Sequence, residues 1–255
     1  MITVSALNAL SRVRHAFFTR DKGLSTGVYA SNNCGFGSDD DPALVARNRQ
    51  RSVERMEMPP EALVTVHQDH TTTVMVTDSP WPQDQLPVAD AIVTTRPRLV
   101  LGVLTADCAP VLMADAKAGV VAAAHAGWRG SLNGILANTV AAMVEQGAKP
   151  DRIIAGIGPC IGPRSYEVGP EFPGPFLERD RDNHIFFSHA RREGHFLFDL
   201  PGFVAKQLAR AGVREIMPTP CDTCREEARF FSYRRAQLRG EPDYGRLLSA
   251  IALER

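Results

Sequence analysis

The 255-residue sequence lacks an excess of charge of either sign, and it lacks any long hydrophobic run. Its 29 Lys and Arg residues balance 29 Asp and Glu residues, so the formal net charge is zero. The chain therefore lacks the excess positive charge that is typical of proteins that bind nucleic acid or an anionic membrane. No segment approaches the apolar length that crosses a bilayer, and the first residues lack the basic and apolar regions of a secretory signal. We therefore expect neither a nucleic-acid partner nor a membrane partner.

Cysteine is scarce, and its number is odd. Five cysteines in a chain of this size without a secretory signal favour free thiols or metal ligands over a disulfide framework. The expected compartment is the cytoplasm, and we expect a monomer.

Histidine is also scarce, with seven residues and no His-x-His pair. A multi-copper oxidase needs several imidazole-rich sites, which seven scattered histidines do not readily furnish. No histidine is followed by Glu two places later, so the His-x-Glu half of the zinc nucleobase deaminase signature is missing. The Pro-Cys-x-x-Cys half is present at residues 220–224, where we interpret Cys221 and Cys224 as reduced thiols in a turn.

Short apolar runs rich in Val predict most of the fold. Several do not alternate with polar residues, which is typical of strands buried on both faces. Strands are predicted at residues 15–20, 62–67, 73–77, 91–95, 99–105, 110–114, 119–124, 153–157, 214–218 and 247–253. Helices are predicted at about 42–57, 131–146 and 201–211, with Pro42 in a first turn and Gly147 as a stop. We expect an α+β fold in a single domain spanning residues 1–255, with mixed β-sheets covered by helices.

Three side chains that can bind a metal lie where predicted strands end. Cys108 follows the apolar run 99–107, His125 follows 120–124, and His70 closes the segment 63–69. One thiolate and two imidazoles suit zinc, and three protein ligands leave a fourth position open for chemistry. No fixed short spacing joins the three, and a buried free cysteine is also a common structural residue.

Other residues near these strand ends leave alternatives open. His67 and His70 point to opposite faces if they share a strand, so the residues alone do not settle which one binds a metal. Asp107 could hydrogen-bond a ligand histidine or a metal-bound water, or it could cap the turn into Pro110. Arg129 precedes the helix predicted from 131, where free backbone N–H groups suit a phosphate. A tight turn with Arg129 in a surface ion pair is the alternative.

Several long motifs are similar to those of one family, and they follow in the same order. They are Val66-His67-Gln68-Asp69-His70, Thr105-Ala106-Asp107-Cys108-Ala109-Pro110-Val111-Leu112, His125-Ala126-Gly127-Trp128-Arg129-Gly130, Gly156-Ile157-Gly158-Pro159-Cys160-Ile161-Gly162 with Ser165-Tyr166-Glu167-Val168, and Phe230-Phe231-Ser232-Tyr233-Arg234-Arg235. The sequence resembles the laccase-domain family, also described as polyphenol oxidase or purine nucleoside phosphorylase, over nearly its whole length. Asp69, in place of the usual apolar residue, and Lys22-Gly23, in place of a glycine pair, are small departures.

The resemblance implies a zinc-dependent enzyme that phosphorolyses adenosine, inosine and methylthioadenosine and also deaminates adenosine. Its partners would be purine nucleosides and phosphate. The metal ligands carry over to His70, Cys108 and His125, and the catalytic candidates are Cys108, His125 and Asp107. The candidates for binding phosphate or substrate are Arg129, Asn33, Arg49 and Arg234, although an arginine is most often a solvated surface residue.

Three other functions compete with this expectation. Cys108 could be the nucleophile and His125 the base of a metal-free hydrolase, which would suit the editing of a peptidoglycan precursor, a role known for some bacterial members. A copper-dependent polyphenol oxidase conflicts with the histidine count. A single His₂Cys site could still take up Cu²⁺ adventitiously, because Cu²⁺ outcompetes Zn²⁺ at most such sites. A non-catalytic ligand-binding protein would not need three ligands around an open metal site.

Overall fold

The computed structural model describes residues 1–254, which form three β-sheets and their covering helices. The strands are β1 Val13–Phe17, β2 Leu63–Val64, β3 Val74–Val76, β4 Ala91–Thr94, β5 Val100–Thr105, β6 Ala109–Asp115, β7 Val120–Ala126, β8 Ile154–Ile157, β9 Glu167–Val168, β10 Phe187–His189, β11 Phe196–Phe198, β12 Glu215–Pro218 and β13 Leu247–Leu253. The helices are α1 Ser5–Asn8, α2 Pro42–Glu54, α3 Trp128–Asn133, α4 Ile135–Glu145, α5 Gly174–Arg179, α6 Leu200–Arg210 and α7 Tyr233–Arg239.

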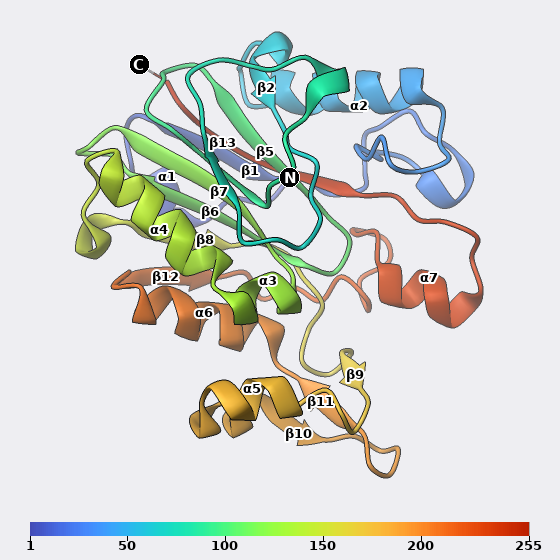
Figure 1. The fold of residues 1–255 in the computed structure, drawn as a ribbon. Coiled ribbons are helices and arrows are strands. Elements are labelled where there is room, and N and C mark those ends of the chain that lie inside the picture. Colours follow the sequence, from blue (N-terminus) through green and yellow to red (C-terminus); the bar gives the residue numbers. More distant parts are fainter. Residues whose placement is uncertain (255) are drawn as a thin grey trace.

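Two large sheets pack face to face and are covered by helices on both outer sides (Figure 1). The six-stranded sheet has the order β12-β8-β6-β7-β4-β3, and the four-stranded sheet has the order β1-β13-β5-β2. Leu101 and Ile251 of the smaller sheet share a buried cluster with Leu112 and Val121 of the larger one. Helices α4 and α6 pack on the outer face of the larger sheet, and the end of α2 packs on the smaller one. The predicted α+β fold with mixed sheets and covering helices is therefore confirmed.

Local chemistry explains where several elements begin and end. Helix α2 starts after Asp41, whose side chain accepts a hydrogen bond from the backbone N–H of Ala43, and it ends at Glu54, before the predicted residue 57. The helix predicted at 131–146 is instead two helices, because Gly134 adopts the left-handed conformation with φ 107° between α3 and α4. Helix α3 already begins at Trp128. Arg129 consequently lies within its first turn and not before a helix starting at 131, which corrects the prediction.

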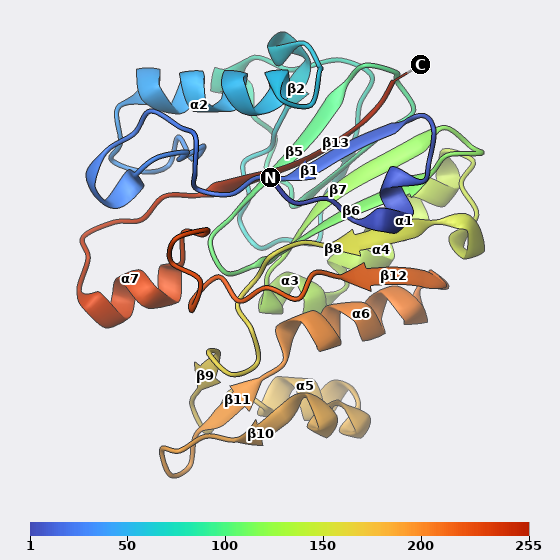
Figure 2. The same cartoon turned by 180° about the vertical axis from the view of Figure 1, so that it is seen from behind.

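A smaller lobe was missed by the sequence prediction. Strands β9, β10 and β11 form a three-stranded sheet beside α5, and this sheet lies below α6 in the view of Figure 2. An aromatic cluster packs inside this lobe, in which the ring centroids of Phe172, of Phe176 in α5 and of Phe198 in β11 are 4.9–5.4 Å apart. Among residues 1–254, no helix combines the length and the apolar character needed to cross a bilayer.

Candidate metal centre

Three segments bring His70, Cys108 and His125 together. Strands β6 and β7 pair antiparallel with Pro110 opposite His125, so the turn that carries Cys108 lies beside the end of β7. His70 lies in the loop between β2 and β3. The ligand atoms of the three side chains all lie within 4.8 Å of one another. His125 is buried, whereas His70 is exposed, so the group opens to solvent on the His70 side.

The distance between the ligand atoms of His70 and Cys108 suits a tetrahedral zinc ion. A nitrogen and a sulfur ligand at usual bond lengths on a tetrahedral ion are about 3.6 Å apart. The Sγ of Cys108 lies 3.7 Å from Nε2 of His70. Within residues 1–254 this is also the one group of three or more His, Cys, Asp or Glu side chains placed to hold a metal. The donor set therefore fits a zinc ion held by three protein ligands, and the distance between the His70 and Cys108 ligand atoms agrees with it.

Asp90, a residue that the sequence prediction missed, connects two of the three segments. Its carboxylate is fully buried and lies 2.7 Å from Nδ1 of His125. The same carboxylate accepts hydrogen bonds from the backbone N–H groups of Asp69, His70 and Thr71, at 3.3, 3.2 and 2.5 Å. An acidic residue directly before a fully buried strand was an available signal, because such a charge is almost never buried without partners.

The backbone around the centre is tightly constrained. His70 and Asp107 both have positive φ, of 56° and 84°, which is uncommon for residues other than glycine and clusters at functional sites. A Cβ atom on Gly127 would lie 2.7 Å from Cδ2 of His70 and 3.1 Å from Sγ of Cys108. Gly127 therefore leaves the space that these two side chains occupy.

Charge around the centre favours a thiolate. Burial would raise the pKa of Cys108, but the neighbouring His125 and His70 lower it to about 6. Burial would lower the pKa of His125, but Cys108 and Asp90 raise it to about 9. A thiolate is the form of cysteine that binds metals and attacks electrophiles, so the side chain is prepared for either role.

Asp107 faces a different set of partners. Its buried carboxylate accepts hydrogen bonds from the hydroxyls of Thr223 and Ser232 at 2.5 and 2.9 Å, and from the backbone N–H of Arg234 at 2.6 Å. It thus ties the Cys108 turn to the start of α7. One expected role of Asp107 was a hydrogen bond to a ligand histidine. In the structure the carboxylate that makes this hydrogen bond, to His125, belongs to Asp90.

The four candidate substrate residues fall into two groups. Arg234 lies beside the centre, since its backbone binds Asp107 and its guanidinium donates to the carbonyl of Glu167. Arg129 is exposed on α3, with its guanidinium over the ring of Trp128. The other two are buried in a separate cluster. Asn33 donates to Ser38 and Asp40, and Arg49 donates to the carbonyl of Cys34 and the hydroxyl of Thr65. Substrate binding by all four stays a prediction.

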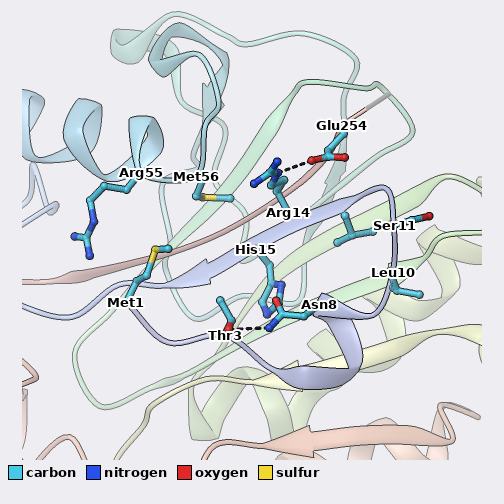
Figure 3. A pocket seen from close by; sticks show the side chains of 11 residues that line it. Met1, Thr3, Asn8, Leu10, Ser11, Arg14, His15, Arg55, Met56 and Glu254 are labelled. Atoms are coloured by element: carbon cyan, nitrogen blue, oxygen red, sulfur yellow. Dashed lines mark hydrogen bonds and ion pairs between the residues drawn. The ribbon is translucent and has the colours of Figure 1, made fainter.

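The remaining candidates lie apart from the group of three. His67 is exposed and forms a bridge with Val88, so the structure brings His70 rather than His67 to the centre. Cys160 is buried, and Cys221 and Cys224 are free thiols in the turn before α7. A cavity of about 390 Å³ lies along β1 between the N-terminal segment and the end of α2 (Figure 3), and none of the predicted site residues lines it.

Comparisons with known proteins find a family model and relatives that cover most of the chain. The model of a family described as multi-copper polyphenol oxidoreductase laccase matches residues 14–254. A protein of Streptomyces griseus named purine nucleoside phosphorylase ORF3 is 40% identical over 234 residues, which cover 88% of this chain and 90% of the relative. A purine nucleoside phosphorylase of Corynebacterium glutamicum is 42% identical over 225 residues, covering 88% and 89%. The crystal structure of Neisseria meningitidis protein NMB0706 is similar with a TM-score of 0.85, 34% identity and 96% coverage of both chains.

Proposed function

The chain belongs to the family described as multi-copper polyphenol oxidoreductase laccase, and from this premise we propose that it is a zinc-dependent purine nucleoside phosphorylase. Its substrates would be adenosine, inosine and methylthioadenosine, with phosphate as the second substrate. The names of the relatives support this activity. The observation that carries the proposal is the convergence of His70, Cys108 and His125, whose ligand atoms all lie within 4.8 Å of one another.

In the proposed reaction, a phosphate oxygen attacks C1′ of the ribose and the bond from C1′ to the purine breaks. Dihydrogen phosphate supplies the proton that leaves with the base, so the products are free purine and ribose 1-phosphate. Bound zinc would supply Lewis acidity to the site. Arg129 is the residue we assign to the phosphate, because its exposed guanidinium has no ion pair with any described residue. Arg234 is assigned to the substrate because its backbone N–H donates to Asp107, the residue before Cys108.

Adenosine deamination is proposed as a side activity of the same centre. Water would add at C6 of the purine and ammonia would leave, giving inosine. Cys221 and Cys224 take no part in this proposal, because they do not belong to the group of three side chains placed to hold a metal.

The test is incubation of the protein with adenosine, with and without phosphate, followed by chromatography. We expect adenine and ribose 1-phosphate only when phosphate is present. Inosine in both samples would establish deamination. A preparation that contains zinc but releases no adenine in the presence of phosphate would contradict the phosphorylase proposal.

A second candidate function is a metal-free cysteine hydrolase, which would suit peptidoglycan-precursor editing. Asp90, His125 and Cys108 have the order of contacts found in a nucleophile, its base and the carboxylate that orients the base. Metal analysis separates the two candidates. Stoichiometric zinc that is lost in Cys108→Ala supports the phosphorylase, whereas a covalent adduct at Cys108 in metal-free protein that still turns over supports the hydrolase.

A further inference from the structure

Asp90 is buried directly before β4, outside the group of three candidate ligands, yet it contacts two of the segments that carry them. We propose that Asp90 is the positioning residue that builds the centre, because it fixes the tautomer of His125 and holds the loop of His70. The inference rests on the proposed metal site.

The first role concerns the ring of His125. Both side chains are almost fully buried, with exposed fractions of 5% for His125 and 0% for Asp90. A carboxylate 2.7 Å from Nδ1 accepts a hydrogen bond, so the proton of the neutral ring resides on Nδ1. The lone pair is then on Nε2, the atom left to face Cys108 and His70. A carboxylate behind a metal-binding histidine sets ring orientation and basicity in this way.

The second role concerns the loop of His70. Three consecutive backbone N–H groups, from Asp69 to Thr71, converge on the Asp90 carboxylate. The loop includes the positive φ of His70, a conformation that costs free energy unless the surroundings stabilise it. The three hydrogen bonds to one buried carboxylate provide that stabilisation.

The backbone of Asp90 joins the same two segments. Its carbonyl accepts a hydrogen bond of 2.7 Å from the N–H of His125, and its N–H donates to the carbonyl of Thr73 at 3.0 Å. One residue therefore sets the relative position of β7 and the His70 loop. Cys108 is placed separately, by the pairing of β6 with β7.

Asp90→Asn separates positioning from packing, since it preserves shape while replacing one carboxylate oxygen by an N–H₂ donor. If the remaining oxygen keeps the amides of Asp69 and Thr71, the new donor takes the place of Oδ1, which faces Nδ1 of His125 and also accepts from the backbone N–H of His70. Nδ1 must then accept, the ring proton moves to Nε2, and the lone pair that would bind zinc is lost. Loss of such an outer carboxylate typically lowers metal affinity about 10- to 100-fold.

Asp115→Asn is the matched control. Asp115 is equally buried, accepts hydrogen bonds from three backbone N–H groups and binds Arg152, but it lies outside the group of three ligands. Both variants should lower thermal stability in the metal-free form. We expect only Asp90→Asn to lose zinc affinity.

The experiment measures zinc affinity of the full-length protein by competition with a chromophoric chelator, alongside thermal unfolding of the metal-free protein. Equal zinc affinity in wild type and Asp90→Asn, or equal losses in the two variants, would overturn the role of Asp90. Wild-type protein that binds no zinc would instead overturn the proposed metal-dependent function itself. Nitrogen NMR of zinc-loaded wild type adds a test that needs no variant: we expect a protonated Nδ1 and a metal-bound Nε2 on His125, and a metal-bound Nδ1 would refute the inference.

Discussion

Gly127→Ala is expected to damage the metal centre while leaving the fold intact. Gly127 has φ −69° and ψ 163°, an extended conformation that alanine adopts without strain. The residue is the N-cap of α3, and as a glycine it has no side chain that could make a capping hydrogen bond, so replacing it by alanine changes stability by no more than about 1 kcal/mol. The consequence of the added methyl group is therefore confined to what it touches.

The added atom touches two of the three proposed ligands. The new Cβ would lie 2.7 Å from Cδ2 of His70, 3.2 Å from its Nε2 and 3.1 Å from Sγ of Cys108. Ordinary contact begins at 3.4 Å, so the ring of His70 must retreat by about 0.7 Å. Metal–ligand distances tolerate deviations of about 0.2 Å. The displacement therefore removes His70 from the coordination sphere, and zinc affinity should fall at least about 10-fold.

Zinc competition with a chelator and adenosine phosphorolysis at fixed zinc concentration measure these effects. Gly37→Ala is the control, because no heavy atom lies within 4 Å of its added Cβ and its φ is not positive. Wild-type zinc affinity and activity in a correctly folded Gly127→Ala protein would refute both the crowding argument and the assignment of His70.

Three further predictions follow from individual side chains. Cys108→Ala should purify without stoichiometric zinc and should show no phosphorolysis, as measured by metal analysis and chromatography. Arg129→Gln should raise the KM for phosphate and leave zinc content unchanged, and an unaltered KM would exclude Arg129 from the phosphate site. Burial lowers the pKa of His15 to about 4, so the unfolded chain takes up the proton first as the pH falls. The contribution of His15 to stability should be full above pH 6.5 and should fall towards pH 4 by up to about 3 kcal/mol, so urea unfolding should show a smaller loss of stability over this range in His15→Asn than in wild type.

The sequence predicts strands well where all the residues of an apolar run are buried. Residues 247–253 were predicted as a strand and form β13 with the same bounds, because every residue of the run is buried. The segment 62–67 is also predicted as a strand, but within it only Leu63 and Val64 pair with a neighbouring strand. Beyond them the chain turns into the His70 loop, where the backbone N–H groups of residues 69–71 donate to the Asp90 carboxylate instead of to a neighbouring strand. Apolar character predicts burial there, but not pairing.

The centre itself was less accessible to prediction from sequence than its three side chains. Strand ends suggested His70, Cys108 and His125, whereas Asp90 is 35 residues from its partner His125 and belongs to no local motif. A hydrogen bond of that sequence separation depends on β4 lying beside β7, with Ala91 opposite Ala124. Nothing in the residues around Asp90 specifies that pairing, so the role of the carboxylate emerges only from the assembled sheet.

The placement of the histidines bears on the oxidase described in the family name. A multi-copper enzyme needs one copper for electron entry and further copper ions with several imidazole ligands. Of the histidines outside the centre, His15 accepts a hydrogen bond from the backbone of Val4 inside the core, and His184 and His195 contact backbone carbonyls in the small lobe. The described residues therefore offer imidazoles for one centre. Copper can still occupy it, because Cu²⁺ binds such donors more tightly than Zn²⁺, but a lone His₂Cys site lacks the second copper cluster that a multi-copper mechanism requires. Copper found in this site would thus reflect the copper available to the protein and would not indicate multi-copper oxidase activity.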